Sequence, residues 1–119
     1  MNQVDIMLKE VNGLQVHQEQ VEAWIKTLGA GYFPIHEQLA CLTEEVGEIA
    51  RVINNQYRTK KKKESDEQKE LGSELVDALF AIVCIANSTG VNLEESWQKL
   101  VEQKLYKRDK DRFKKEELQ

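Results

Sequence analysis

The stretch Leu75-Val-Asp-Ala-Leu-Phe-Ala-Ile-Val-Cys-Ile-Ala86 decides the fold class, because it is apolar at every position except Asp77. A helix that is apolar all round is buried on all sides. The stretch therefore predicts a central core helix spanning about 67–88, with Gly90 as the residue that closes it. A lone carboxylate inside such a helix is unfavourable unless it is paired or binds a metal ion. We therefore expect Asp77 to be buried with a partner.

The rest of the chain also has helical periodicity. Pro34 is the only proline, and the alternation of apolar and polar residues that marks strands is nearly absent. This pattern predicts an all-α fold, a bundle of about four helices. The expected helices cover about 3–28 with a break or kink at Asn12-Gly13, about 35–56, about 67–88, and from Asn92 as N-cap to about 115. The second has an apolar stripe that we expect to face the core, namely Leu39, Leu42, Val46, Ile49 and Ile53.

Length, charge and the first residues limit the class of protein. The 119 residues allow one domain, covering 1–119, and the net charge of -4 gives no reason to expect a nucleic-acid partner. The first ten residues lack the basic and apolar regions of a secretory signal, and the apolar run 75–86 is too short to cross a bilayer. We therefore expect a cytoplasmic protein without a membrane partner. The large apolar surface of the third helix favours a homo-oligomer.

Cys41 and Cys84 both lie among apolar neighbours. Two cysteines in a chain of this size do not make a disulfide framework. We expect both to be reduced thiols that act as small buried apolar residues lining the bundle.

Two pairs of acidic residues stand three positions apart, Glu45 with Glu48 on the second expected helix and Glu74 with Asp77 on the third. Residues three apart share a helix face, where like charges oppose helix formation unless something neutralises them. Gly47 lies between the first two, at a helix cost of roughly 1 kcal/mol. A glycine there indicates the close approach of another backbone or of a ligand.

The ligand types decide which cation these carboxylates would take. Oxygen ligands suit hard ions such as Mg²⁺ or Mn²⁺. Di-iron bundles need Glu-x-x-His, but the only histidines, His17 and His36, follow Leu14 and Phe33 at that spacing. Zinc is disfavoured by the same lack of histidine. Because Mg²⁺ commonly binds substrate phosphates, the pattern points to phosphate chemistry. The alternative is a solvated acidic face, with Asp77 paired to a lysine or arginine.

These residues resemble the signature of a known family, the MazG-like all-α nucleoside triphosphate pyrophosphohydrolases. The family's mark is EExxE, a variable gap and then ExxD. The flanking segments 42–50 and 70–79 also resemble the family, and the resemblance is strongest over about 35–110. Among its members, the short single-domain, YpjD-like branch is the most similar. In this chain the signature reads Glu44-Glu45-x-x-Glu48, a gap of 25 residues, then Glu74-x-x-Asp77.

The resemblance implies a magnesium-dependent enzyme, with Mn²⁺ as a possible substitute. It would hydrolyse NTP or dNTP substrates to the monophosphate and pyrophosphate, including house-cleaning of nucleotide pools. It implies a dimer or a dimer of dimers, with the site partly built across subunits. It also implies catalytic roles for Glu44 and Glu48, one of which orients the attacking water. The implied metal ligands are Glu45, Glu48, Glu74 and Asp77.

The resemblance also implies basic substrate contacts on the fourth helix. Four residues there share one helix face that starts apolar and ends basic, which places Lys104 and Arg108 as candidate phosphate contacts. Where the family often has an asparagine, this chain has Leu105. A solvated helix end that favours cations is the alternative for both basic residues. The four residues are Trp97, Val101, Lys104 and Arg108.

Three aromatic residues, Trp24, Tyr32 and Phe33, are candidates to stack on a nucleobase. Trp24 also falls at core spacing with Ile25 and Leu28, so core packing is its alternative role. Two other functions stay open: a non-catalytic helical interaction module, and a related enzyme acting on a phosphoribosyl-linked pyrophosphate. The module predicts that metal and nucleotide leave the melting temperature unchanged.

Overall fold

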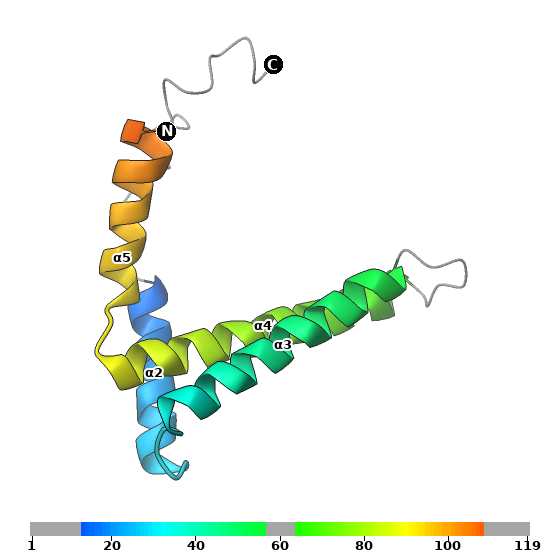
Figure 1. Cartoon of the computed structure of the whole chain (residues 1–119), viewed down its shortest axis with the longest axis horizontal. Helices are drawn as coiled ribbons and strands as arrows, with labels where there is room; N and C mark the ends of the chain where they lie inside the picture. Colours follow the sequence, from blue (N-terminus) through cyan, green and yellow to red (C-terminus); the bar gives the residue numbers. More distant parts are fainter. Residues whose placement is uncertain (1–12, 57–63, 109–119) are drawn as a thin grey trace. The chain divides into compact units, whose positions relative to one another are not determined.

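The computed structural model describes residues 13–56 and 64–108 of the 119-residue chain. These residues form helices and short loops with no strand among them, which confirms the all-α fold (Figure 1). The helices are α2 (Gly13–Thr27), α3 (Ile35–Gln56), α4 (Glu64–Thr89), α5 (Leu93–Lys99) and the π-helix η1 (Leu100–Arg108).

The chain divides into two compact units. Gln18–Val91 form the central unit, and the described residues 13–17 and 92–108 belong to the terminal unit. Each unit has its own internal contacts. The acidic residues of both predicted pairs belong to the central unit.

In the central unit, α3 and α4 run side by side in opposite directions (Figure 1). Side chains of α2 also contact α4: Gln18 Nε2 donates a hydrogen bond to Asn87 Oδ1 at 2.9 Å, and Asn87 Nδ2 donates to the Gln18 carbonyl at 3.0 Å. Two reciprocal amide bonds of this kind set the register between the helices. The buried apolar residues of this unit are Ile25, Val52, Ala78, Val83 and Ala86.

The helix ends follow the local sequence. Gly90 has φ of 77°, and the Val91 N–H donates to the Ala86 carbonyl at 2.9 Å, the bond of a Schellman cap. Asn92 Oδ1 then accepts from the Glu95 N–H at 3.1 Å and caps α5. Both predicted signals are confirmed. The predicted helix 35–56 agrees with α3, whereas residues 3–12 and 109–115 of the other predicted helices lie outside the described residues.

The terminal unit contains a buried carboxylate with defined partners. Glu94 is 9% exposed, and its Oε1 accepts a hydrogen bond from the Leu14 N–H, in the first turn of α2, at 3.2 Å. Its Oε2 accepts from Gln98 Nε2 at 3.3 Å. A negative charge at a helix N-terminus is favourable because free N–H groups point toward it. Glu94 thus links α5 to the start of α2.

The predicted burial of α4 is wrong for much of its apolar surface. In the central unit, the packing of α4 against its neighbours buries Ala78, Val83 and Ala86. Asp77 is also exposed, so its predicted burial is wrong for the single chain. Three of the five residues of the predicted α3 stripe are also exposed, namely Leu39, Val46 and Ile53. The exposed large apolar residues of α4 are Leu75, Val76, Leu79, Phe80 and Ile82.

Two smaller expectations also need correction. Cys41 is exposed and Cys84 is half-buried, because the side of α3 that carries Cys41 is open; both remain free thiols. A Cβ added at Gly47 would meet no atom within 4 Å, so no other described backbone approaches it closely. Whatever explains this glycine lies outside the described residues or depends on a ligand.

By length and composition, residues Glu70–Thr89 could cross a membrane, which corrects the argument from the shorter run 75–86. The core helix of a soluble protein meets the same criteria. This segment carries carboxylates at Glu70, Glu74 and Asp77. An aspartate near the middle of a membrane-spanning helix costs about 3 kcal/mol on insertion scales. The composition therefore favours a packing surface over a membrane span.

Candidate active site

The pairing of α3 with α4 brings together three of the four predicted metal ligands. Glu45 comes from α3, and Glu74 and Asp77 come from adjacent turns of α4. One carboxylate oxygen from each lies within 4.8 Å of the other two. We call these three residues the acidic cluster. Glu45 and Glu74 are half-buried and Asp77 is exposed, so the cluster opens to solvent on one side.

The mutual repulsion of the carboxylates in the acidic cluster favours the binding of a cation. Partial desolvation raises the pKa of Glu45, and the negative charges of Asp77 and Glu74 raise it further. Such repulsion is relieved when a positive ion binds between the carboxylates. An all-carboxylate set of ligands matches the preference of Mg²⁺ and Mn²⁺ for oxygen. The residues present therefore fit a hard divalent cation.

Glu48 points to a different partner. Its Oε2 lies 3.0 Å from Arg51 Nε, and Arg51 Nη2 lies 3.0 Å from Glu70 Oε1. The hydrogen bond to Glu48 is the main reason that the pKa of Arg51 is raised. The sequence analysis missed Arg51, although its spacing of three from Glu48 was a usable signal. Glu44 is exposed on α3 and, like Glu48, is outside the acidic cluster.

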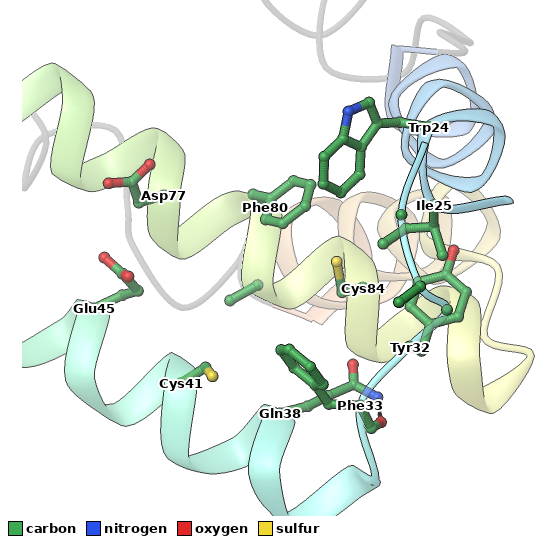
Figure 2. A pocket seen from close by; sticks show the side chains of 14 residues that line it. Trp24, Ile25, Tyr32, Phe33, Gln38, Cys41, Glu45, Asp77, Phe80 and Cys84 are labelled. Atoms are coloured by element: carbon green, nitrogen blue, oxygen red, sulfur yellow. Dashed lines mark hydrogen bonds between the residues drawn. The ribbon is translucent and has the colours of Figure 1, made fainter. Parts of the chain in front are cut away.

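A cleft of about 470 Å³ adjoins the acidic cluster. Glu45 and Asp77 lie at one end of it, and aromatic side chains from α2, α4 and the loop before α3 lie toward the other (Figure 2). We call these the acidic end and the aromatic end. The lining side chains labelled in Figure 2 are Trp24, Ile25, Tyr32, Phe33, Gln38, Cys41, Glu45, Asp77, Phe80 and Cys84.

Contacts between distant parts of the sequence build the aromatic end. The rings of Trp24 and Phe80 meet edge to face, with centroids 6.1 Å apart and planes at 78°. Asn87 Nδ2 donates a hydrogen bond to the Tyr32 hydroxyl at 3.0 Å. Burial raises the pKa of Tyr32, which keeps the hydroxyl protonated. Trp24 thus lines the cleft and is half-exposed, and it is not part of a closed core.

The sequence analysis placed Trp24, Tyr32 and Phe33 as candidate base contacts, and all three line the cleft. It missed Phe80 and Gln38. Phe80 follows Asp77 by three residues, so helix geometry alone predicts that the two share a face. Gln38 had no comparable signal.

The half-buried thiol of Cys84 is poorly suited to react. Burial, and then the neighbouring Cys41, raise the pKa of Cys84. The reactive form of cysteine is the thiolate, and a raised pKa lowers its population near neutral pH. We therefore assign Cys84 a packing role.

The predicted basic contacts belong to the terminal unit. Lys104 is exposed on η1. Arg108 ends the same helix, and its side chain, like that of Leu105, lies outside the described part of the structure. Phosphate binding by Lys104 and Arg108 stays a prediction.

The cleft thus combines the acidic cluster, whose residues fit a divalent cation, with the aromatic end. Cations neutralise polyphosphates, and aromatic faces stack on flat bases. The ligand that matches both ends is a molecule with a polyphosphate chain and a planar ring.

Comparisons with known proteins agree with this geometry. Residues 33–113 match the family described as the MazG nucleotide pyrophosphohydrolase domain. An uncharacterised protein, YpjD, of Bacillus subtilis (strain 168) is 40% identical over 100 residues, which are 84% of this chain and 89% of that protein. A crystal structure of a MazG protein conserved in Bacillus, a nucleotide pyrophosphohydrolase, is 36% identical with a TM-score of 0.66 and covers 87% of this chain and 99% of that chain. The matched residues include the whole acidic cluster.

Proposed function

Because this chain belongs to the MazG nucleotide pyrophosphohydrolase family, we propose that it hydrolyses nucleoside triphosphates to monophosphate and pyrophosphate with the help of Mg²⁺. Its family makes it a hydrolase of pyrophosphate bonds in nucleotides. The observation that carries the finer proposal is the acidic cluster at one end of an aromatic cleft. A nucleotide can then reach the cation with its phosphates and the aromatic end with its base.

Glu45, Glu74 and Asp77 are the residues proposed to hold the metal. When bound, Mg²⁺ would neutralise the triphosphate and make the attacked phosphorus more electrophilic. Mn²⁺ has the same preference for oxygen ligands and can serve as a substitute in tests. The exposed side of Asp77 leaves the cluster open to substrate phosphates.

Glu44 and Glu48 are proposed to orient the attacking water. Glu48 holds Arg51 through Oε2, so contact of this particular oxygen with the metal would require the ion pair to loosen. Both side chains are exposed, and an ion pair of this kind contributes little to stability. Glu48 can therefore change partner at small cost, which is compatible with its predicted place among the ligands.

Trp24, Tyr32 and Phe33 are proposed to contact the base. Lys104 and Arg108 stay candidate phosphate contacts on the fourth predicted helix.

We also propose that the exposed apolar face of α4 packs against a second copy of the chain. Five large apolar residues of this helix are 39–62% exposed, which is more than a monomer normally leaves on one element. A homo-oligomer buries this face and the neighbouring exposed part of α3. We propose that the oligomer acts in the cytoplasm on nucleotide pools.

Product analysis tests the reaction. The protein is incubated with a panel of NTPs and dNTPs plus Mg²⁺, and the products are separated by ion-exchange chromatography. Monophosphate with pyrophosphate supports the proposal, whereas diphosphate with phosphate contradicts the cleavage position. Absence of turnover on every nucleotide, together with a Glu48→Gln variant that binds metal like the wild type, contradicts the site. If the protein hydrolyses a phosphoribosyl-linked pyrophosphate but none of the nucleotides, its substrate belongs to the phosphoribosyl-linked class.

Light scattering after size exclusion tests the oligomer. The wild type is expected at twice the mass of the chain or more. Val76→Lys places a charge on the most exposed apolar residue of α4 and should shift the population toward the monomer. A monomeric wild type contradicts the packing proposal, and a requirement for detergent points to a membrane instead.

A further inference from the structure

Gln38, on the first turn of α3, has a buried and unsatisfied acceptor. The residue is 6% exposed. Its Oε1 exposes less than 1 Å² and has no hydrogen-bond partner in the described part of the chain. Buried polar atoms nearly always have a partner, so an exception needs an explanation. A ligand that supplies the missing donor is one such explanation.

The amide of Gln38 is held in one orientation. Its Nε2 donates to the Phe33 carbonyl at 2.7 Å and to Ser88 Oγ at 2.9 Å. A carbonyl only accepts, and the single hydroxyl proton of Ser88 is directed to the Ile85 carbonyl at 3.1 Å, so both partners need a donor from Gln38. Rotating the amide by 180° would set Oε1 against the Phe33 carbonyl. Gln38 therefore presents an acceptor and no donor.

This acceptor belongs to the aromatic end of the cleft, where Figure 2 shows Gln38 near Phe33 and on the far side of Cys41 from Glu45. The Tyr32 hydroxyl is already engaged by Asn87. The indole nitrogen of Trp24 lies on the edge of its ring that is remote from Gln38 (Figure 2). Of these three polar groups, Gln38 Oε1 is therefore the one that can accept a hydrogen bond from a ligand.

We propose that Gln38 Oε1 accepts a hydrogen bond from the exocyclic amino group of the substrate's base, so that the enzyme prefers adenine and cytosine to their keto counterparts. This inference rests on the proposed function. An amino group at the corner of the ring supplies the donor that Oε1 lacks. A keto oxygen at the same corner would face Oε1 as a second acceptor, and such a base could satisfy Oε1 only by shifting until its neighbouring ring N–H takes the place of the amino group.

Access to Oε1 requires a lining side chain to shift. Phe33 is the candidate, because it lines the cleft and is 61% exposed. Its carbonyl holds the Gln38 amide while the ring is free to turn onto the base. The same residue can therefore orient the acceptor and cover the bound base.

Matched substrates test the proposal in the wild-type enzyme. CTP with UTP, and ATP with ITP, differ at the ring corner in question, where an amino group is exchanged for a keto oxygen. We expect kcat/KM to be about tenfold or more higher for the amino member of each pair, since a site built to bind a donor rejects analogues without it. Equal values within each pair, or a preference for the keto member, would overturn the proposal.

Two variants separate recognition from a structural role. Gln38→Met keeps the length of the side chain and removes Oε1, so the CTP/UTP and ATP/ITP ratios should fall close to one. Ser88→Ala keeps Oε1 but releases the amide, and should reduce the ratios by a smaller factor. A purely structural role would lower activity on all four nucleotides equally and leave the ratios unchanged, which would overturn the proposal.

Binding without catalysis distinguishes this inference from the proposed function. Calorimetry with CMP, UMP, AMP and IMP needs no turnover. Tighter binding of CMP and AMP, lost in Gln38→Met, supports base reading even if the cleavage reaction differs from the one proposed. Hydrolysis of all triphosphates with no such preference leaves the proposed function intact and removes only the role of Gln38.

Discussion

The two ends of the cleft differ in how their polar groups are satisfied. At the acidic end, Glu45, Glu74 and Asp77 repel one another, and the repulsion contributes to the raised pKa of Glu45. At the aromatic end, Gln38 Nε2 and the Tyr32 hydroxyl have defined hydrogen bonds, whereas the buried Gln38 Oε1 has no partner among the described residues. At the acidic end, a cation would relieve the repulsion between the carboxylates. At the aromatic end, one hydrogen-bond donor would satisfy Gln38 Oε1. This difference supports the proposal that different parts of one ligand complex bind at the two ends.

The largest loss of activity is expected from the substitution Glu45→Gln at the acidic end. The variant removes one of three clustered charges, and we expect kcat to fall by about a hundredfold to a thousandfold, as when one electrostatic contact to the reacting group is lost. Glu37→Gln, on the same helix but outside the cluster, is the control. Steady-state kinetics with Mg²⁺ measures both. Comparable activity in the two variants would remove Glu45 from the site.

The effects of pH and Mg²⁺ on the stability of the protein also test the acidic end. A carboxyl group whose pKa is higher in the folded than in the unfolded state stabilises the fold at low pH, and this contribution is lost as pH rises through the folded pKa. Glu45 has an ordinary value of 4.5 and is shifted upward, so the metal-free protein should lose stability as pH rises above that value. Mg²⁺ at a hundred times its Kd should raise Tm by about 5–10 °C at pH 8.

The shift should be smaller at pH 5, because protons then compete with the metal for Glu45. Thermal melts at both pH values, with and without Mg²⁺, measure this. Glu45→Gln should flatten the pH dependence of the metal-free protein. A Mg²⁺ shift of equal size at both pH values would contradict the assignment.

At the aromatic end, Trp24→Ala should lower kcat/KM by about tenfold, because loss of one aromatic stacking partner costs about 1–3 kcal/mol per base. Trp97→Ala is a matched control, since Trp97 is 46% exposed and Trp24 is 47% exposed, but only Trp24 lines the cleft. The effect should appear in KM more than in kcat. Equal losses in both variants would mean that Trp24 acts through the fold alone.

The smallest effect is expected from Gly47→Ala, which tests the helix surface between Glu45 and Glu48. Gly47→Ala should raise the free energy of unfolding by about 1 kcal/mol, because alanine favours the helix and a Cβ there meets no atom within 4 Å. Urea denaturation measures this difference. A destabilised variant, or one with a smaller assembly mass, would show that another copy of the chain packs against this position.

Local signals were sufficient for the helices and for part of the site. The spacing of apolar residues predicted α3 at its observed bounds, and the capping signals at Gly90 and Asn92 were confirmed. The spacing of the acidic pairs, with the family resemblance, identified all three residues of the acidic cluster. Helix geometry and capping act within a few residues, so they are readable along the chain.

The burial of α4 and the contacts between helices could not be predicted from local signals, because they depend on which elements pack together. Asp77 and much of α4 were expected to be buried, but burial depends on neighbours that the described chain does not supply. The sequence alone determined the helices, their ends and the two acidic pairs, because these follow from local spacing. Only the tertiary structure decided that Arg51 of α3 reaches Glu70 of α4, that Phe80 meets Trp24, and that Gln38 Oε1 is buried without a partner among the described residues. Each of these depends on the exact approach of side chains from separate turns or helices, and no periodicity encodes such an approach.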